Sequence, residues 1–156
     1  MKAGKALLEA RSRRLDRSPQ AVVVHCGDHR FQECFREFLT EYLGVVSYAV
    51  LSIPGGPHFL PFQQFMPKFA SAGMQSISFH VKHARPDKLI LLGHDGCVFF
   101  KERLQFFFAE ESLREKQLAN LRKSRMILQE RFPGVPVETY YADSGEDGQV
   151  RFLGLD

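Results

Sequence analysis

The chain has 156 residues, of which 44% are hydrophobic and 25% are charged. It contains no apolar stretch near the roughly 20 residues that a membrane span needs, so the sequence argues against a membrane partner. This composition is typical of one globular domain with one hydrophobic core. Three cysteines at irregular spacing argue against a disulfide framework and favour a reducing, cytoplasmic location.

The net charge of +3 comes from the first 20 residues. They carry six Lys or Arg against Glu9 and Asp16, which leaves 15 basic and 16 acidic side chains in the rest of the chain. We expect residues 1–20 to form a basic helical arm and residues 21–156 to form a single domain. A basic arm can bind nucleic acid or an anionic membrane, but a solvated amphipathic helix explains it as well. Because the body lacks a basic stripe, we expect no nucleic-acid partner.

The predicted elements alternate between strands and helices. Strands are expected at 21–25, 45–53, 88–93 and 135–141, where short apolar runs end in glycine, proline or polar residues. Helical spacing covers 31–43, a segment from Pro67 to about His83, and a long stretch over about 98–131 whose pattern allows a break near Phe108 and Ala109. Residues 149–153 fit a short antiparallel edge strand.

This alternation predicts an α/β fold, with a mostly parallel sheet of four strands in the order 2-1-3-4 and helices on both faces. Binding sites in such sheets form beyond the carboxyl ends of the strands, at the point where the strand order reverses. With this order, the loops after the first and third strands are neighbours at that point. Cys26 follows the first strand, and His94 and Cys97 follow the third, so we expect the three to meet.

Cys26, His94 and Cys97 form a candidate Zn²⁺ site. The spacing of His94 and Cys97 lets both face one ion from a single turn, and Cys26 supplies a third bond. Structural zinc usually has four protein ligands, whereas catalytic zinc has three and a water, and two Cys with one His is a known catalytic set. The pattern therefore predicts a catalytic site with one position open; buried structural cysteines or a redox pair are the alternatives.

Asp28 and Arg30 are predicted to form a charge-assisted pair beside this site. They are two residues apart, which places both side chains on one side of an extended segment. Arg30 would hold the carboxylate away from the metal, oriented to accept a hydrogen bond from zinc-bound hydroxide. If Asp28 swings free, it can take the fourth position and close the site. The alternative is a surface ion pair that contributes little to stability.

The strings Cys-x-Asp-x-Arg at 26–30 and His-x-x-Cys at 94–97 resemble those of the β-class carbonic anhydrases. The similarity in layout continues through 135–141 and 148–152, and it covers about 21–153. The resemblance implies reversible hydration of CO2 to bicarbonate at zinc, and a homodimer or higher assembly in which an N-terminal helix embraces the partner.

The chain departs from that family at three places. His29 stands where the family usually has Ser, and 52–56 read Ser-Ile-Pro-Gly-Gly in place of an Arg-Asn-Ala-Gly type of string. The sequence also ends before the C-terminal helical extension of many members. These departures leave two other functions open: a non-catalytic zinc-binding or sensing protein in which Asp28 closes the site, and a hydrolase of a CO2-like heterocumulene.

Four further residues are candidates for the pocket. Gly55 and Gly56 form a turn that can present backbone N–H groups to the Asp–Arg pair or to bicarbonate, and His58 can line the pocket mouth. His29 is a candidate proton shuttle, because histidine can titrate near neutral pH. The alternation of side chains points His29 away from Asp28, which favours a structural or solvent role.

Overall fold

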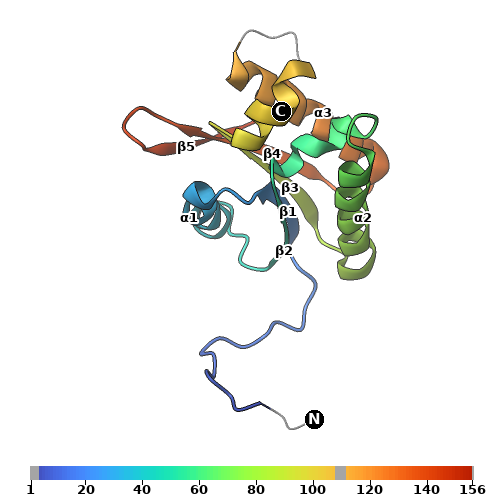
Figure 1. Cartoon of the computed structure of the whole chain (residues 1–156). Helices are drawn as coiled ribbons and strands as arrows, with labels where there is room; N and C mark the ends of the chain where they lie inside the picture. The colour runs from blue at the N-terminus through green and yellow to red at the C-terminus, as the bar shows by residue number, and fades with distance from the viewer. Residues whose placement is uncertain (1–3, 108–111, 156) are drawn as a thin grey trace.

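The computed structural model describes residues 4–107 and 112–155. Its centre is a five-stranded sheet with the order β2-β1-β3-β4-β5 (Figure 1). Four strands pair in parallel, and β5 pairs antiparallel with β4. The predicted sheet, with its strand order and antiparallel edge strand, is confirmed. The strands are β1 (Ala21–Cys26), β2 (Tyr48–Ile53), β3 (Lys88–His94), β4 (Val137–Ser144) and β5 (Val150–Gly154).

The two central strands are buried on both faces. All of β1 is buried, and β3 is buried from Leu89 to its end. Val23 and Ile90 face one core cluster, while Val22 and Leu91 face the cluster on the opposite side of the sheet. This double burial explains why both strands appear in the sequence as continuous apolar runs without a polar alternation.

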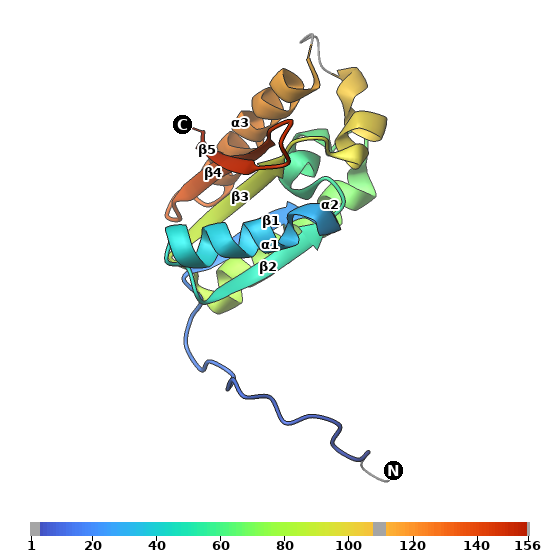
Figure 2. The same ribbon diagram turned by 90° about the vertical axis from the view of Figure 1, so that its left-hand side faces the viewer.

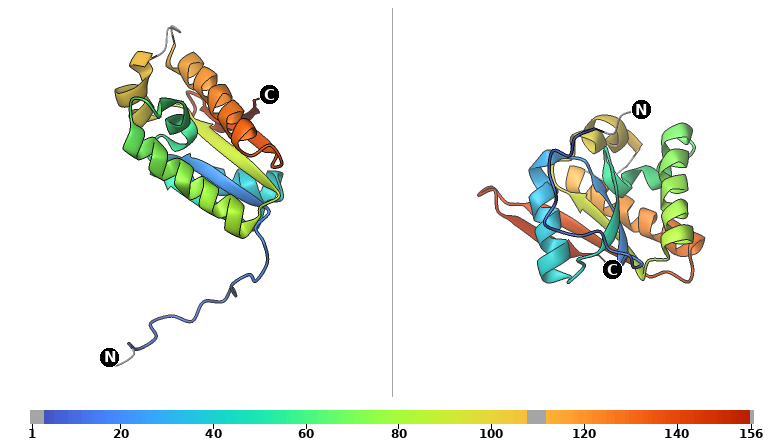
Figure 3. Two further views of the ribbon diagram at one scale, coloured as in Figure 1. Left: turned by 90° about the vertical axis from the view of Figure 1, so that its right-hand side faces the viewer. Right: turned by 90° about the horizontal axis from the view of Figure 1, so that it is seen from below.

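Helices cover both faces of the sheet, as Figures 2 and 3 show from two sides and from below. On one face lies α1 (Gln32–Glu37), continued by the π-helical segment η2 (Phe38–Tyr42), with Phe35 in the core. On the other lie α2 (Pro67–Ala84) and α3 (Leu113–Arg131), which contribute Ile77 and Leu128 to the second core. Between β2 and α2 the chain forms the 3₁₀ segment η3 (Gly56–Phe62).

Several element boundaries differ from the prediction. Gly44, at φ +66°, follows η2 as expected, but the next strand begins only at Tyr48 because the Val45 N–H donates to the Leu39 carbonyl oxygen. The long helical stretch is divided into a π-helical segment η4 (Phe100–Leu104), a 3₁₀ turn η5 (Gln105–Phe107) and α3. A capping box between Ser112 and Glu115 starts α3. The expected break at Phe108 and Ala109 lies outside the described residues.

The N-terminal segment differs most from expectation. Residues 4–20 form no helix and extend away from the body (Figure 1). The prediction of a helical arm is therefore wrong for these residues in the single chain. Leu7 and Leu8 are 97% and 85% exposed. Isolated helices shorter than about 12–15 residues are marginal in water, because most helical stability in proteins comes from packing an apolar face.

Within the described part of the chain, no helix has the length and apolar character needed to cross a bilayer.

Candidate metal centre

Cys26, His94 and Cys97 converge at the carboxyl ends of two neighbouring strands. Cys26 is the last residue of β1, His94 is the last residue of β3, and Cys97 follows in the next turn. Their ligand atoms all lie within 4.8 Å of one another, and all three residues are buried. The structure thus brings together the three donors singled out in the sequence.

The hydrogen bonding of His94 suits a metal ligand. Its Nδ1 lies 2.8 Å from the carbonyl oxygen of Asp95, which can only accept, so Nδ1 is the donor and Nε2 is the nitrogen left for a metal. Nε2 is buried and has no nitrogen or oxygen partner in the described structure, and the His94 side chain interacts with the sulfur of Cys26. The ring packs 4.4 Å from that of Phe31, which restricts its orientation. A buried ring nitrogen beside two thiols fits a site completed by Zn²⁺.

The two thiols interact directly. Cys97 donates a hydrogen bond to the sulfur of Cys26, which lowers the pKa of Cys26 and raises that of Cys97. The Gly55 N–H also donates to Cys26 Sγ at 3.3 Å. The backbone N–H groups of Phe99 and Phe100 donate to the sulfur of Cys97. The backbone donors favour the thiolate form of each cysteine, which is the form that binds metal, whereas the hydrogen bond between the two sulfurs keeps the proton on Cys97.

Asp28 and Arg30 form an ion pair with side-chain hydrogen bonds. Arg30 Nη2 lies 2.6 Å from Asp28 Oδ2, and its Nε lies 3.0 Å from Oδ1. The backbone N–H of Arg30 also donates to Oδ1, at 3.0 Å. The Asp28 side chain is only 12% exposed. The hydrogen bonds from Arg30 lower the pKa of Asp28 to about 2, so the carboxylate is an ionised acceptor at neutral pH.

The Arg30 guanidinium also links the loop after β1 to the loop after β3. Arg30 Nη2 donates to the Gly96 carbonyl oxygen at 3.2 Å, within the turn between His94 and Cys97. Gly96 permits this turn because its φ is +61°, in the left-handed region. Asp28 is therefore fixed to both loops and lies outside the converging donor group.

A cleft of about 490 Å³ opens over this pair. Its polar side includes Asp28, exposed His29 and Arg30, and its apolar side includes Val98 and Phe99. The lining otherwise consists of Cys26, Gly27 and Pro54. The cleft thus combines an ionised acceptor with an apolar wall directly beside the donor group.

Gly55, Gly56 and His58 were expected at the pocket, but they do not line this cleft, and all three are buried. Gly56 has φ +55°, and a Cβ at that position would lie 2.6 Å from the Cys26 backbone nitrogen. This close approach brings the N–H of Gly55 to the Cys26 sulfur. His58 Nδ1 lies 2.7 Å from Asn120 Oδ1, and burial lowers the pKa of His58 to about 4, so its ring is neutral.

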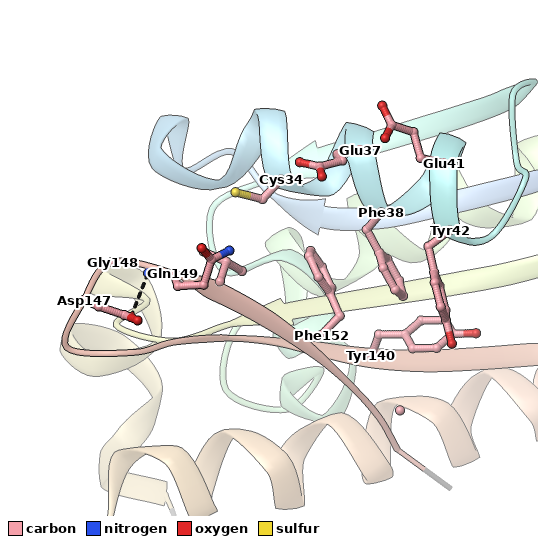
Figure 4. Close-up of a pocket in the computed structure, with 12 residues that line it drawn as sticks. Cys34, Glu37, Phe38, Glu41, Tyr42, Tyr140, Asp147, Gly148, Gln149 and Phe152 are labelled. Carbon is pink, nitrogen blue, oxygen red and sulfur yellow. Dashed lines mark hydrogen bonds between the residues drawn. The ribbon is translucent and has the colours of Figure 1, made fainter.

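A larger cavity, of about 790 Å³, lies between α1 and the β4–β5 hairpin (Figure 4). Aromatic rings from three elements meet in it, and the Phe38 ring stacks on that of Phe152 with centroids 4.0 Å apart. Its lining includes Cys34 but none of the residues predicted for the site. The candidate chemistry therefore belongs to the smaller cleft.

Comparisons with known proteins agree with this topology. No protein-family model matches the chain, and no curated protein matches its sequence. Among solved structures, the chain is similar to the β-carbonic anhydrase CafA of Aspergillus fumigatus, with 18% identity, a TM-score of 0.52, and coverage of 88% of this chain and 76% of that one. The chain has the β-carbonic anhydrase fold.

Two more solved structures share this fold. A β-carbonic anhydrase isoform from Trichomonas vaginalis has 14% identity and a TM-score of 0.53, with 92% of this chain and 88% of that chain covered. A tetrameric β-carbonic anhydrase from Sordaria macrospora has 17% identity and a TM-score of 0.52, with 88% and 81% covered. The similarity predicted from the two ligand strings is thus confirmed at the level of the β-carbonic anhydrase fold.

Two residues that the sequence analysis did not single out hold the ligand loops in this fold. Gln32 Nε2 donates to the carbonyl oxygens of Cys26, at 3.0 Å, and Asp28, at 2.7 Å. Gln117 Nε2 donates to the carbonyl oxygen of His94 at 3.0 Å. The one signal for Gln117 in the sequence is its position on the buried side of a helix, three residues before Asn120.

Gly56→Ala is expected to destabilise this β-carbonic anhydrase fold strongly. The left-handed backbone alone costs a residue with a Cβ about 1–2 kcal/mol, and the overlap with the Cys26 backbone adds to that loss. Gly134→Ala is the matched control, because Gly134 is exposed and a Cβ there meets no atom within 4 Å. Urea unfolding of both variants measures the difference. Equal unfolding midpoints would contradict the close approach at Gly56.

Proposed function

We propose that the protein is a zinc hydro-lyase that catalyses the reversible hydration of CO2 to bicarbonate. The observation that carries this proposal is the meeting of three zinc donors with an ionised Asp28 that Arg30 holds outside the donor group. Three protein donors leave a coordination position for water, as in catalytic zinc sites. The β-carbonic anhydrase fold supports the same function.

Each residue has a defined role in this proposal. Cys26 Sγ, Cys97 Sγ and His94 Nε2 would hold the Zn²⁺ ion. When bound, zinc lowers the pKa of a water ligand and supplies a nucleophile near neutral pH. Asp28 accepts a hydrogen bond from the attacking water and so orients it toward the carbon of CO2. Arg30 holds Asp28 in place and keeps its own proton at all working pH values.

The cleft provides for both the substrate and the released proton. Val98 and Phe99 present an apolar wall suited to CO2, which is small and carries no net dipole. Water adds to the carbon of CO2, bicarbonate leaves, and one proton must pass to buffer. His29 is exposed on the polar side of the cleft, which is the position that a proton shuttle requires.

We also propose that the protein works as a homodimer or higher homo-oligomer in a reducing compartment such as the cytoplasm. The Sordaria macrospora neighbours are tetrameric. Val98, Phe106 and Phe107 are 57%, 78% and 47% exposed, which is apolar surface that a second subunit could cover. Cys26 and Cys97 must stay reduced to bind metal, which a reducing compartment provides.

Stopped-flow measurement of CO2 hydration by the zinc-loaded protein, between about pH 6 and pH 9, tests the proposed activity directly. We expect a rate above that of buffer, lost on metal removal with a chelator. A rate equal to buffer with zinc bound would overturn it and favour a non-catalytic zinc-binding protein. Turnover of carbonyl sulfide without turnover of CO2 would instead identify a heterocumulene hydrolase.

A further inference from the structure

α3 carries three polar residues on its buried face. Gln117, Asn120 and Ser124 are spaced by three and four residues, which places them on one side of the helix, and all are 0% exposed. Leu121 and Leu128 are buried on the same helix and fill the core with apolar side chains. Polar groups in such positions cost free energy unless they are hydrogen-bonded, so their partners indicate what they contribute.

Gln117 binds the loop that carries two of the metal donors. Its Nε2 donates to the His94 carbonyl oxygen at 3.0 Å, and its Oε1 accepts from the Tyr141 hydroxyl at 2.8 Å. Tyr141 is fully buried in β4, so both ends of the Gln117 amide are fixed. The backbone of His94, at the end of β3, is thereby held to α3 as well as to the sheet.

Asn120 and Ser124 bind the loop that donates to the third metal ligand. Asn120 Oδ1 accepts from His58 Nδ1 at 2.7 Å, and Ser124 Oγ donates to the Pro57 carbonyl oxygen at 2.9 Å. Pro57 and His58 directly follow the turn in which the Gly55 N–H reaches the Cys26 sulfur. One face of one helix therefore contacts both loops that shape the donor group.

We propose that Gln117, Asn120 and Ser124 are positioning residues that set the geometry of the Cys26, His94 and Cys97 donors. This inference rests on the metal centre of the proposed function. Gln117 also binds the Tyr141 hydroxyl, and Ser124 also contacts the Asn120 carbonyl oxygen within α3. The other hydrogen bonds of the three residues reach His94 or the loop at Pro57 and His58. Outer-shell contacts of this kind change metal affinity by roughly 10–100-fold. These three polar residues thus set the affinity and geometry of the metal site, whereas the leucines of the same helix contribute to stability.

Cobalt titration of the full-length protein, read by its thiolate-to-cobalt absorption bands and by competition with a chelator, tests the inference. Gln117→Met and Asn120→Leu keep the side-chain size and remove the hydrogen bonds. We expect each to weaken cobalt affinity by roughly 10–100-fold and to change the absorption bands. Ser124→Ala, which removes a single hydroxyl, provides a mild variant if a larger change prevents folding, and we expect a smaller loss of affinity in the same direction.

Two controls on α3 separate positioning from stability. Gln129→Met makes the same chemical change at an exposed site, and we expect wild-type cobalt affinity. Leu128→Ala opens a cavity in the core, and we expect a lower Tm with unchanged cobalt bands. Wild-type affinity and bands in Gln117→Met, Asn120→Leu and Ser124→Ala would overturn the inference, as would an equal loss in Leu128→Ala. A wild-type protein that binds cobalt but does not hydrate CO2 refutes the proposed function alone.

Discussion

Cys97→Ser is expected to abolish both metal binding and CO2 hydration. Cys97 is 1% exposed, and its sulfur belongs to the group of three donors within 4.8 Å of one another. A serine hydroxyl stays protonated near neutral pH and is a poor zinc ligand, so only Cys26 and His94 would remain. We expect the zinc content to fall from about one ion per chain to near none, a larger loss than the roughly 10–100-fold effect of outer-shell changes.

Elemental analysis of the purified protein measures the metal, and stopped-flow hydration measures the activity of the same sample. Cys34→Ser is the matched control, because Cys34 is a free cysteine on α1 that lines the separate cavity of Figure 4. We expect that variant to keep its zinc and its rate. A Cys97→Ser protein with a full complement of zinc would show that the metal, if any, binds elsewhere.

The donor group could be predicted because its positions follow from strand order. The buried runs of β1 and β3 are readable as apolar strings, and in a parallel sheet their carboxyl ends lie side by side. Cys26, His94 and Cys97 come directly after those strings. The Asp28 to Arg30 pair was also predictable, because its contacts are local and its spacing is short.

The contacts that support the donor group could not be predicted from the sequence. They join segments far apart in the chain, and in most of them one partner is a backbone N–H or carbonyl group, which does not depend on the residue type. Gln117 binds a backbone carbonyl of β3, and the Gly55 N–H binds a side chain of β1. A glutamine within a charged helix is ordinarily a solvated residue, and its position on the buried side of the helix does not reveal which atom it binds. His58 was expected at a pocket mouth, but the packing of η3 against α3 places it in the interior.

Residues 52–56 show how the chain differs from the expected β-carbonic anhydrase string without losing the group of three donors. Ser52 to Gly56 read differently from that string, yet the turn after β2 delivers a backbone N–H to the sulfur of Cys26. A backbone donor does not depend on the side chain, so the sequence there can change as long as Gly56 permits the close approach. Sequence divergence at this turn is therefore compatible with the convergence of Cys26, His94 and Cys97.

Arg30→Gln is expected to leave the metal in place and to slow CO2 hydration strongly. The Arg30 guanidinium donates to both carboxylate oxygens of Asp28 and to the Gly96 carbonyl oxygen, so its loss leaves Asp28 held only by the backbone N–H of residue 30 and unlinked from the Gly96 turn. A freed carboxylate can enter the open coordination position and exclude water. Loss of an oriented proton acceptor commonly costs about 10²–10⁴-fold in rate, and we expect an effect in that range.

Stopped-flow rates together with zinc content distinguish this variant from Cys97→Ser, since only the rate should fall. In cobalt-loaded Arg30→Gln protein, an added anion should no longer perturb the absorption bands, because Asp28 would occupy the exchangeable position. Arg36→Gln is the matched control: Arg36 pairs with Glu33 at 3.1 Å, and both side chains are largely exposed. Wild-type hydration by Arg30→Gln would show that Asp28 needs no guanidinium to stay outside the donor group, and that the pair is only a loop contact.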